Sequence, residues 1–179
     1  MTSIEKAVKV LKSGGVIAFP TETVFGIGAL ITQKKAIRRI FAMKNRPLNK
    51  PLQVLVADLE QAKKLGKFDR KAIQLAESSW PGPLTLVVYK KIIVPKLVTG
   101  GGNTVGLRIP DHKITLELLQ KCGPIVATSA NISDKKPALT AKAVKKALPE
   151  IDYILTGKVK TGKASQVIDL TRNFKVLRK

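Results

Sequence analysis

Apolar residues recur along the chain at two different spacings, and these spacings predict interleaved helices and strands. Where they recur every three or four positions, they predict six amphipathic helices. The first helix stops at the Gly14-Gly15 pair, and two prolines in the segment KNRPLNKP end the second. The predicted helices lie at residues 4–11, 36–41, 59–65, 69–78, 115–121 and 141–148.

Short apolar runs between the helices predict strands. They lie at 16–19, 52–56, 84–89, 104–109 and 125–128, with three short strands near Ile154, Val167 and Val176. Residues 20–29 (PTETVFGIGA) are expected to form a loop. Several strands follow loops instead of helices, which argues against a purely parallel doubly wound sheet. We therefore expect an α/β fold with a mixed, twisted open sheet flanked by helices.

Length and residue usage narrow the class of protein. A chain of 179 residues predicts a single domain over 1–179, with no additional C-terminal domain. The one cysteine, Cys122, excludes a disulfide framework, and the one histidine, His112, excludes a histidine-ligated metal centre. No apolar run is long enough to cross a membrane. We therefore expect a soluble, cytoplasmic protein with no membrane partner and no metal site of its own.

The charge balance indicates an anionic partner without identifying it. There are 33 Lys and Arg against 12 Asp and Glu, so the net charge is +21. Such a field attracts nucleic acids and nucleotides, although lysines scattered over a surface can equally reflect genome composition. Aromatic residues make up only 4% of the chain, which is too few for the base-stacking platforms of single-strand binders. No G-x-x-x-x-G-K-[ST] segment occurs, which excludes a P-loop.

Three sharply turned polar loops are candidate functional elements. Residues 20–23 (PTET) fit a ligand loop or an ordinary turn with a helix cap. Residues 44–47 (KNRP), with Lys50 shortly after, gather three cations that suit a polyphosphate, the alternative being a solvated basic loop. Residues 128–131 (TSAN) offer hydroxyl and amide groups that would also cap a helix.

A fourth candidate is Arg108, which is isolated in the apolar strand pattern TVGLRIP. Burying an arginine is costly unless the guanidinium meets an anion. A ligand carboxylate or phosphate would meet this need, and so would an acidic side chain of the protein itself. Both alternatives remain open at this point.

Six segments, in their order and spacing, closely resemble the YrdC family of L-threonylcarbamoyl-AMP synthases, and the likeness covers residues 3–178. They are GGVIAFPTETVFGIGA, KNRPLNKPL, WPGPLTLVV, TVGLRIPDH, GPIVATSANIS and SQVIDL. The resemblance implies a nucleotidyltransferase that condenses L-threonine, bicarbonate and ATP into threonylcarbamoyl-AMP and pyrophosphate. It further implies Mg²⁺ carried by the nucleotide, and a downstream complex that transfers the threonylcarbamoyl group to tRNA.

The resemblance also assigns roles to individual residues through the family's Lys-x-Arg…Ser-x-Asn signature and its neighbouring motifs. Arg108 would clamp the threonine carboxylate with two nitrogens, and Phe25 would pack on the substrate. The resemblance implies that the catalytic residues are Lys44 and Arg46. It implies that ATP is bound by Arg46, Lys50, Thr104, Asn131, Thr140 and Arg178. It implies that L-threonine is bound by Thr23, Arg108, Ser129 and Ser165.

Two other interpretations are weighed against the synthase. The same fold could be a non-catalytic module that holds double-stranded RNA or tRNA on a basic face. It could also resemble the carbamoyl-transferring module of hydrogenase-maturation proteins, although that module usually belongs to a much longer chain. An arginine in an apolar strand favours the enzyme, because an RNA-binding module has no need of a carboxylate clamp there.

Overall fold

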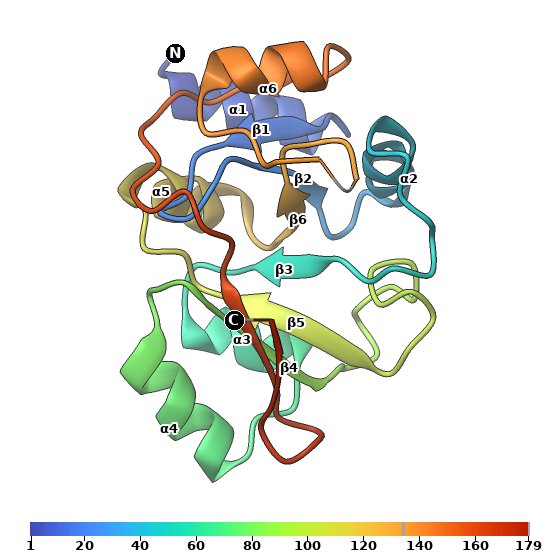
Figure 1. Cartoon of the computed structure of the whole chain (residues 1–179), viewed down its shortest axis with the longest axis vertical. Coiled ribbons are helices and arrows are strands. Elements are labelled where there is room, and N and C mark those ends of the chain that lie inside the picture. The colour runs from blue at the N-terminus through green and yellow to red at the C-terminus, as the bar shows by residue number, and fades with distance from the viewer. Residues whose placement is uncertain (134, 179) are drawn as a thin grey trace.

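In the described part of the chain, nine strands form one sheet with helices around it (Figure 1). The computed structural model describes residues 1–133 and 135–178. The strand order is β7-β1-β2-β6-β3-β5-β4-β8-β9. The strands are β1 (Ile17–Phe19), β2 (Gly26–Leu30), β3 (Gln53–Leu55), β4 (Leu84–Tyr89), β5 (Thr104–Arg108), β6 (Ile125–Ser129), β7 (Tyr153–Ile154), β8 (Gln166–Asp169) and β9 (Lys175–Arg178).

The pairing of these strands confirms the predicted mixed sheet. The β1–β7, β3–β5 and β4–β8 pairs are parallel. The β1–β2, β2–β6, β3–β6, β4–β5 and β8–β9 pairs are antiparallel. Sequence neighbours such as β3 and β4 are separated in the sheet by β5, so the central strands bring together distant parts of the chain.

Six helices in the described residues agree with the predicted stripes to within a few residues at each end. Several begin at side-chain caps: Thr2 and Glu5 form a capping box on the first, and Asp58, Asp69 and Thr140 each cap another by accepting a backbone N–H. The helices are α1 (Ser3–Lys12), α2 (Lys34–Met43), α3 (Leu59–Leu65), α4 (Arg70–Ser79), α5 (Lys113–Cys122) and α6 (Ala141–Ala147).

Successive side chains of a strand point to opposite faces of the sheet, so the apolar residues of the strands reach both faces. In β1, Ile17 and Phe19 belong to one buried cluster, while Ala18 belongs to the other. Helices α1 and α5 cover the Phe19 side, where Leu11 and Leu118 pack against the strands. Along the long axis of the molecule, α6 and α4 lie towards opposite ends (Figure 1).

The prediction of a loop over residues 20–29 is wrong in its second half, where β2 inserts between β1 and β6. Glycines weaken strand propensity, which is why the sequence pattern predicts a loop here. Here the sheet requires them: a Cβ at Gly28 would lie 2.5 Å from Ile125 Cγ2 and 2.6 Å from the Val126 carbonyl oxygen. Close packing around β2 therefore overrides the local preference.

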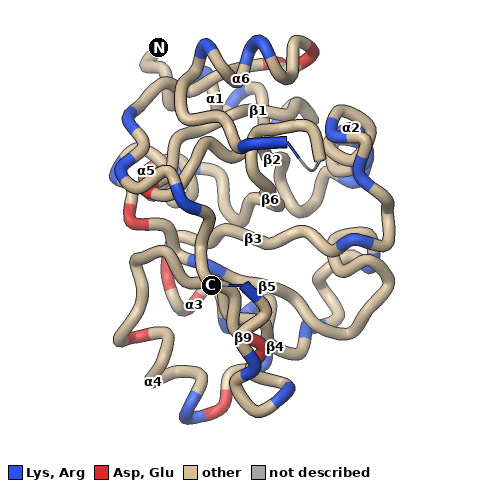
Figure 2. Tube along the Cα trace, viewed as in Figure 1, with Lys and Arg blue, Asp and Glu red and all other residues tan. Residues whose placement is uncertain are grey.

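The basic residues are spread over the whole trace and do not gather on one element (Figure 2). Among the described residues, no helix is long and apolar enough to cross a membrane. The bulk charge thus marks no single helix or strand of the fold.

The close approach at Gly28 predicts that Gly28→Ala lowers the free energy of unfolding by about 1–3 kcal/mol, because the new methyl group overpacks the β2–β6 pair. Urea unfolding measures the change. The matched control is Gly102→Ala at an exposed position, where the nearest atom is 3.3 Å away, and its effect should stay within about 0.5 kcal/mol. Equal stability of Gly28→Ala and the wild-type chain would contradict the packing argument.

Candidate functional site

A cavity of about 460 Å³ opens on the same face of the sheet as Phe19. One cross-strand row forms its floor: Ala127, Gln53, Gly106, Val87 and Asp169 are successive register partners on β6, β3, β5, β4 and β8. Register partners face the same side of the sheet, so these five residues all line the cavity, and Gly106 does so with its backbone. Its wall also includes Thr21, Thr23, Gly26, Arg46, Thr85, Thr104, Arg108, Thr128, Ser129, Ser165, Arg172 and Arg178.

The cations that line the cavity are arginines, whereas most cations of the chain are lysines. Four of the chain's seven arginines line it, namely Arg46, Arg108, Arg172 and Arg178, whereas no lysine is among the described lining residues. Asp169 is the one carboxylate among those residues, and its Oδ1 accepts from the backbone N–H and the hydroxyl of Thr171. Guanidinium groups fork onto carboxylates and phosphates, so the cavity suits an anionic ligand.

Arg108 is buried at the end of β5 and pairs with an acidic side chain of the protein. Its Nη2 donates to Glu22 Oε1 at 2.6 Å and to Thr23 Oγ1 at 3.1 Å, while its Nε donates to the Gly82 carbonyl at 3.0 Å. Burial lowers the pKa of Arg108, and the charge of Glu22 acts in the opposite direction. Of the two alternatives that the sequence left open, the internal acid is therefore present, and the side chain still lines the cavity.

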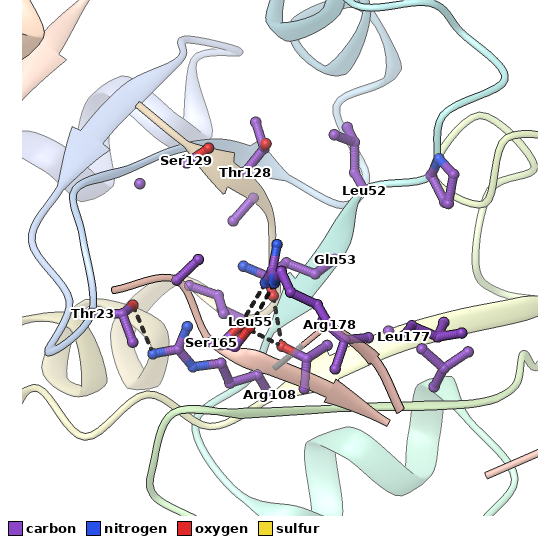
Figure 3. A pocket seen from close by; sticks show the side chains of 18 of the residues that line it. Thr23, Leu52, Gln53, Leu55, Arg108, Thr128, Ser129, Ser165, Leu177 and Arg178 are labelled. Atoms are coloured by element: carbon purple, nitrogen blue, oxygen red, sulfur yellow. Dashed lines mark hydrogen bonds between the residues drawn. The ribbon is translucent and has the colours of Figure 1, made fainter. Parts of the chain in front are cut away.

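Two threonines of the loop after β1 form an ordered chain of hydroxyl groups. Thr21 Oγ1 donates its proton to the Val24 carbonyl at 2.7 Å, so the 2.7 Å contact between Thr21 and Thr23 must be donated by Thr23. Thr23 Oγ1 also accepts from Arg108 (Figure 3). Its proton is therefore already used, and towards a ligand Thr23 is left as an acceptor.

A second hydrogen-bonded chain crosses the floor and reaches the last strand. Thr85 Oγ1 donates to Gln53 Oε1 at 2.9 Å and contacts Ser165 Oγ at 3.0 Å. Arg178 donates from Nη2 to Ser165 Oγ at 3.0 Å and from Nε to the Ser165 carbonyl at 2.7 Å (Figure 3). Burial and the charge of Arg108 lower the pKa of Arg178, so the two guanidinium groups act on one region of the cavity.

Lys44, at the end of α2, is enclosed by a loop and does not line the cavity. Its Nζ donates to the carbonyl of Ser129 at 2.6 Å, to the carbonyl of Asn131, and to Asn131 Oδ1 at 3.4 Å. The Asn131 amide in turn donates to the carbonyls of Ile132 and Lys135. Burial lowers the pKa of Lys44 to about 8, with a further contribution from the charge of Arg46. The signature residues Lys44 and Asn131 thus fasten the loop that presents Ser129.

The comparison with protein families gives the context for this cavity. Residues 9–179 match the family model Sua5/YciO/YrdC, described as telomere recombination. The chain belongs to this family. The match confirms the resemblance drawn from the six sequence segments.

Two curated proteins with similar sequences are named threonylcarbamoyl-AMP synthase. The chain is 43% identical over 165 residues to the threonylcarbamoyl-AMP synthase of Pyrococcus abyssi, covering 90% of this chain and 48% of that protein. It is 35% identical over 164 residues to the threonylcarbamoyl-AMP synthase of Vibrio vulnificus, covering 89% of this chain and 88% of that protein. The chain thus spans about half the length of the Pyrococcus relative and most of the Vibrio one.

The fold is also that of a solved family member. The crystal structure of P. abyssi Sua5 complexed with L-threonine superposes with a TM-score of 0.91 at 42% identity, covering 94% of this chain and 51% of that one. This likeness confirms the YrdC-like fold class.

The structure brings together most of the residues proposed for the site. Thr23, Arg46, Thr104, Arg108, Ser129, Ser165 and Arg178 all line the cavity. Lys44, Lys50, Asn131 and Thr140 lie outside the lining: Lys50 is exposed, and Thr140 caps α6. Phe25 is fully buried in the core and does not reach the cavity, so the expectation that it packs on a substrate is wrong.

Sequence reasoning missed Gln53, Thr85, Asp169 and Arg172 as cavity residues. Gln53 and Thr85 are polar residues inside apolar strand patterns, which is the signal that singled out Arg108. Among the residues that the structure describes, no group of three or more His, Cys, Asp or Glu side chains could hold a metal ion. Burial raises the pKa of Cys122 to about 12, so this thiol is a poor nucleophile at neutral pH.

The enclosure of Lys44 predicts a specific pH dependence of stability. Between about pH 8 and pH 10.5 the unfolded chain keeps the Lys44 proton while the folded chain releases it, so this group adds roughly 3 kcal/mol to the free energy of unfolding as the pH rises. Lys44→Met lacks this contribution. Urea unfolding at pH 7.5, 9 and 10 should show the wild-type chain gaining stability relative to the variant.

The control for this prediction is Lys142→Met, which removes the same charge at an exposed position of α6. The difference between this variant and the wild-type chain should stay constant over the same pH range. A constant difference for Lys44→Met as well would show that the Lys44 ammonium has an ordinary pKa.

Proposed function

We propose that this chain is an L-threonylcarbamoyladenylate synthase, a nucleotidyltransferase that joins L-threonine, bicarbonate and ATP into threonylcarbamoyl-AMP. The observation that carries the proposal is the cavity with four arginines and no described lining lysine. The names of the curated relatives support it, as does the solved relative complexed with L-threonine. A non-catalytic RNA-binding module would have no need of a buried arginine in the wall of such a cavity.

The proposed reaction makes two bonds without a nucleophile from the protein. The threonine amine attacks the carbon of bicarbonate, and loss of water leaves a carbamate. A carbamate oxygen then attacks the α-phosphorus of ATP, and pyrophosphate leaves with the bonding electrons. The main physical difficulty is to hold a carboxylate, a carbamate and a triphosphate together, which fixed cations and exclusion of water relieve.

The amino-acid end is proposed to lie between β5 and the loop after β1. Arg108 Nη1 would receive the carboxylate, and Thr23 Oγ1, which has only acceptor capacity left, would accept from the amino group. Ser129 and Ser165 would complete this end of the site. A fork of two Arg108 nitrogens onto the carboxylate would require Nη2 to leave Glu22 or Thr23.

The nucleotide end is proposed to involve Arg46 and Arg178 on the phosphates, with Thr104 nearby. Contacts from Lys50, Asn131 and Thr140, which the family resemblance implies, would need the nucleotide to extend beyond the cavity. Lys44 would contribute as a positioning residue through its hold on the Ser129 loop. Mg²⁺ would neutralise phosphate charge, and because the described residues offer no acidic cluster it would arrive on the nucleotide.

The product would pass to an enzyme complex that transfers the threonylcarbamoyl group to an adenosine of tRNA. The proposal names this partner only by the class of reaction that it carries out, because the names of the curated relatives identify no partner protein.

A pyrophosphate-release assay tests the proposal. With ATP, Mg²⁺ and bicarbonate, release is expected only when L-threonine is added, and L-serine and a bicarbonate-free sample serve as controls. Release that is independent of threonine, or no release together with no threonine binding, would refute the synthase assignment.

Arg46→Ala is expected to weaken ATP binding by about tenfold or more, because it removes a guanidinium from the cavity wall. Its effect on L-threonine binding should be small. Isothermal titration calorimetry with each ligand measures both. Arg70→Ala, which removes the same charge from the exposed start of α4, is the matched control. An unchanged ATP affinity in Arg46→Ala would contradict the phosphate assignment.

A further inference from the structure

Glu22 has no part in the proposed chemistry, yet it is one of the most buried charged side chains of the molecule. It is 3% exposed and lies behind Arg108, outside the lining of the cavity. Its Oε1 accepts from Arg108 Nη2 at 2.6 Å, and both side chains of this ion pair are almost inaccessible to water. Burial of a charge is costly, so the Glu22 carboxylate is expected to have a specific effect on Arg108.

The hydrogen-bond count of Arg108 shows what Glu22 achieves. A guanidinium carries five N–H hydrogens, one on Nε and two on each Nη. The Nε hydrogen goes to the Gly82 carbonyl, and the two on Nη2 go to Glu22 and Thr23. Among the described residues, none hydrogen-bonds Nη1. Both remaining hydrogens are therefore on the one nitrogen that the protein leaves for a ligand.

The geometry of the Glu22–Arg108 ion pair keeps Nη1 of Arg108 free of a partner among the described residues. Glu22 meets Arg108 through Oε1 alone, and its buried Oε2 has no hydrogen-bond partner among the described residues. A two-oxygen fork onto both Nη atoms would satisfy Oε2, and it would also occupy Nη1. The observed single contact leaves Oε2 unsatisfied and both Nη1 hydrogens unused by the described residues, and because Arg108 lines the cavity these hydrogens can serve a ligand carboxylate.

We propose that Glu22 is a positioning residue that locks the Arg108 guanidinium with Nη1 towards the cavity and thereby sets the affinity for the carboxylate of the amino-acid substrate. The inference rests on the proposed function. Gly82 and Thr23 are neutral partners, and each holds one edge of the group. Only the Glu22 carboxylate supplies a charge that fixes the plane of the guanidinium before the ligand arrives, so no side-chain ordering is needed on binding.

The backbone of Glu22 has a separate task, which makes the side chain testable. Its carbonyl oxygen accepts from the N–H groups of Lys160 and Thr161, at 3.1 and 2.8 Å, and so holds the segment that leads to Ser165. Substitution of the side chain leaves these backbone bonds in place. Glu22→Gln then removes the charge while it keeps the size and an acceptor oxygen.

The experiment measures L-threonine and ATP binding to the full chain by isothermal titration calorimetry. Glu22→Gln is expected to raise the Kd for L-threonine by about tenfold to a hundredfold, because a loosened guanidinium is misplaced for the carboxylate. The Kd for ATP should change by no more than about twofold. The matched control is Asp111→Asn, which makes the same chemical change in the exposed Asp111–Lys160 pair and should leave both affinities unchanged.

A spectroscopic measurement separates positioning from a general structural role. In the wild-type chain, restricted rotation should give Arg108 separate NMR signals for its two Nη groups, assigned with Arg108→Lys. In Glu22→Gln these signals should broaden or merge, while the urea midpoint still shows a folded protein. If Glu22→Gln does not fold, Glu22→Asp keeps the charge but shortens the side chain, and it should give a smaller loss of threonine affinity.

Wild-type threonine affinity in a folded Glu22→Gln or Glu22→Asp would overturn the inference. Parallel loss of threonine and ATP binding would also overturn it, because it would indicate a purely structural role. Failure of the wild-type chain to bind threonine would instead refute the proposed function, and the Arg108 signals would still decide whether Glu22 locks the guanidinium.

Discussion

The burial of one guanidinium is the constraint around which the cavity is organised. Arg108 ends β5, Glu22 belongs to the loop after β1, and Gly82 precedes β4, so the contacts of one side chain join three segments that are distant in sequence. A buried charge must keep all of these partners, since loss of either member of such a pair typically costs about 3–5 kcal/mol. The strand ends on the two sides of the cavity are therefore held in a fixed relation by electrostatics as well as by sheet hydrogen bonds.

The two kinds of cation in this chain have different places and therefore different meanings. Lysines are the more numerous cations and are distributed over the trace (Figure 2), whereas all the cationic side chains among the described residues that line the cavity are arginines. Burial makes a lysine easier to deprotonate, as the lowered pKa of Lys44 shows, whereas an arginine stays charged and directs its hydrogens in fixed directions. The net charge thus attracts polyanions at long range, whereas the arginines of the cavity determine which anionic ligand can bind there.

Two residues of the family signature, Lys44 and Asn131, form hydrogen bonds that hold a loop of the fold. Lys44 and Asn131 use their polar atoms to close the loop after β6, and that loop carries Ser129 to the cavity wall. A motif read from sequence does not distinguish a residue that touches a ligand from one that positions its neighbour, because both are polar and both lie in the same loop. The hydrogen bonds of Lys44 and Asn131 give both residues a positioning role within this loop.

The sequence by itself determined the helices, most strands and the mixed character of the sheet, because hydrophobic periodicity is a local signal. Polar loops after strands contained the candidates Thr23, Arg46 and Ser129, an isolated polar residue in a strand gave Arg108, and the family resemblance gave their individual roles. Only the tertiary structure decided that Gly26–Leu30 is a strand, that Phe25 belongs to the core, and that Gln53 and Thr85 face the cavity. It also decided that Arg108 pairs with Glu22. These features depend on which strand lies beside which, and strand order is set by contacts between residues far apart in the chain, which no local pattern records.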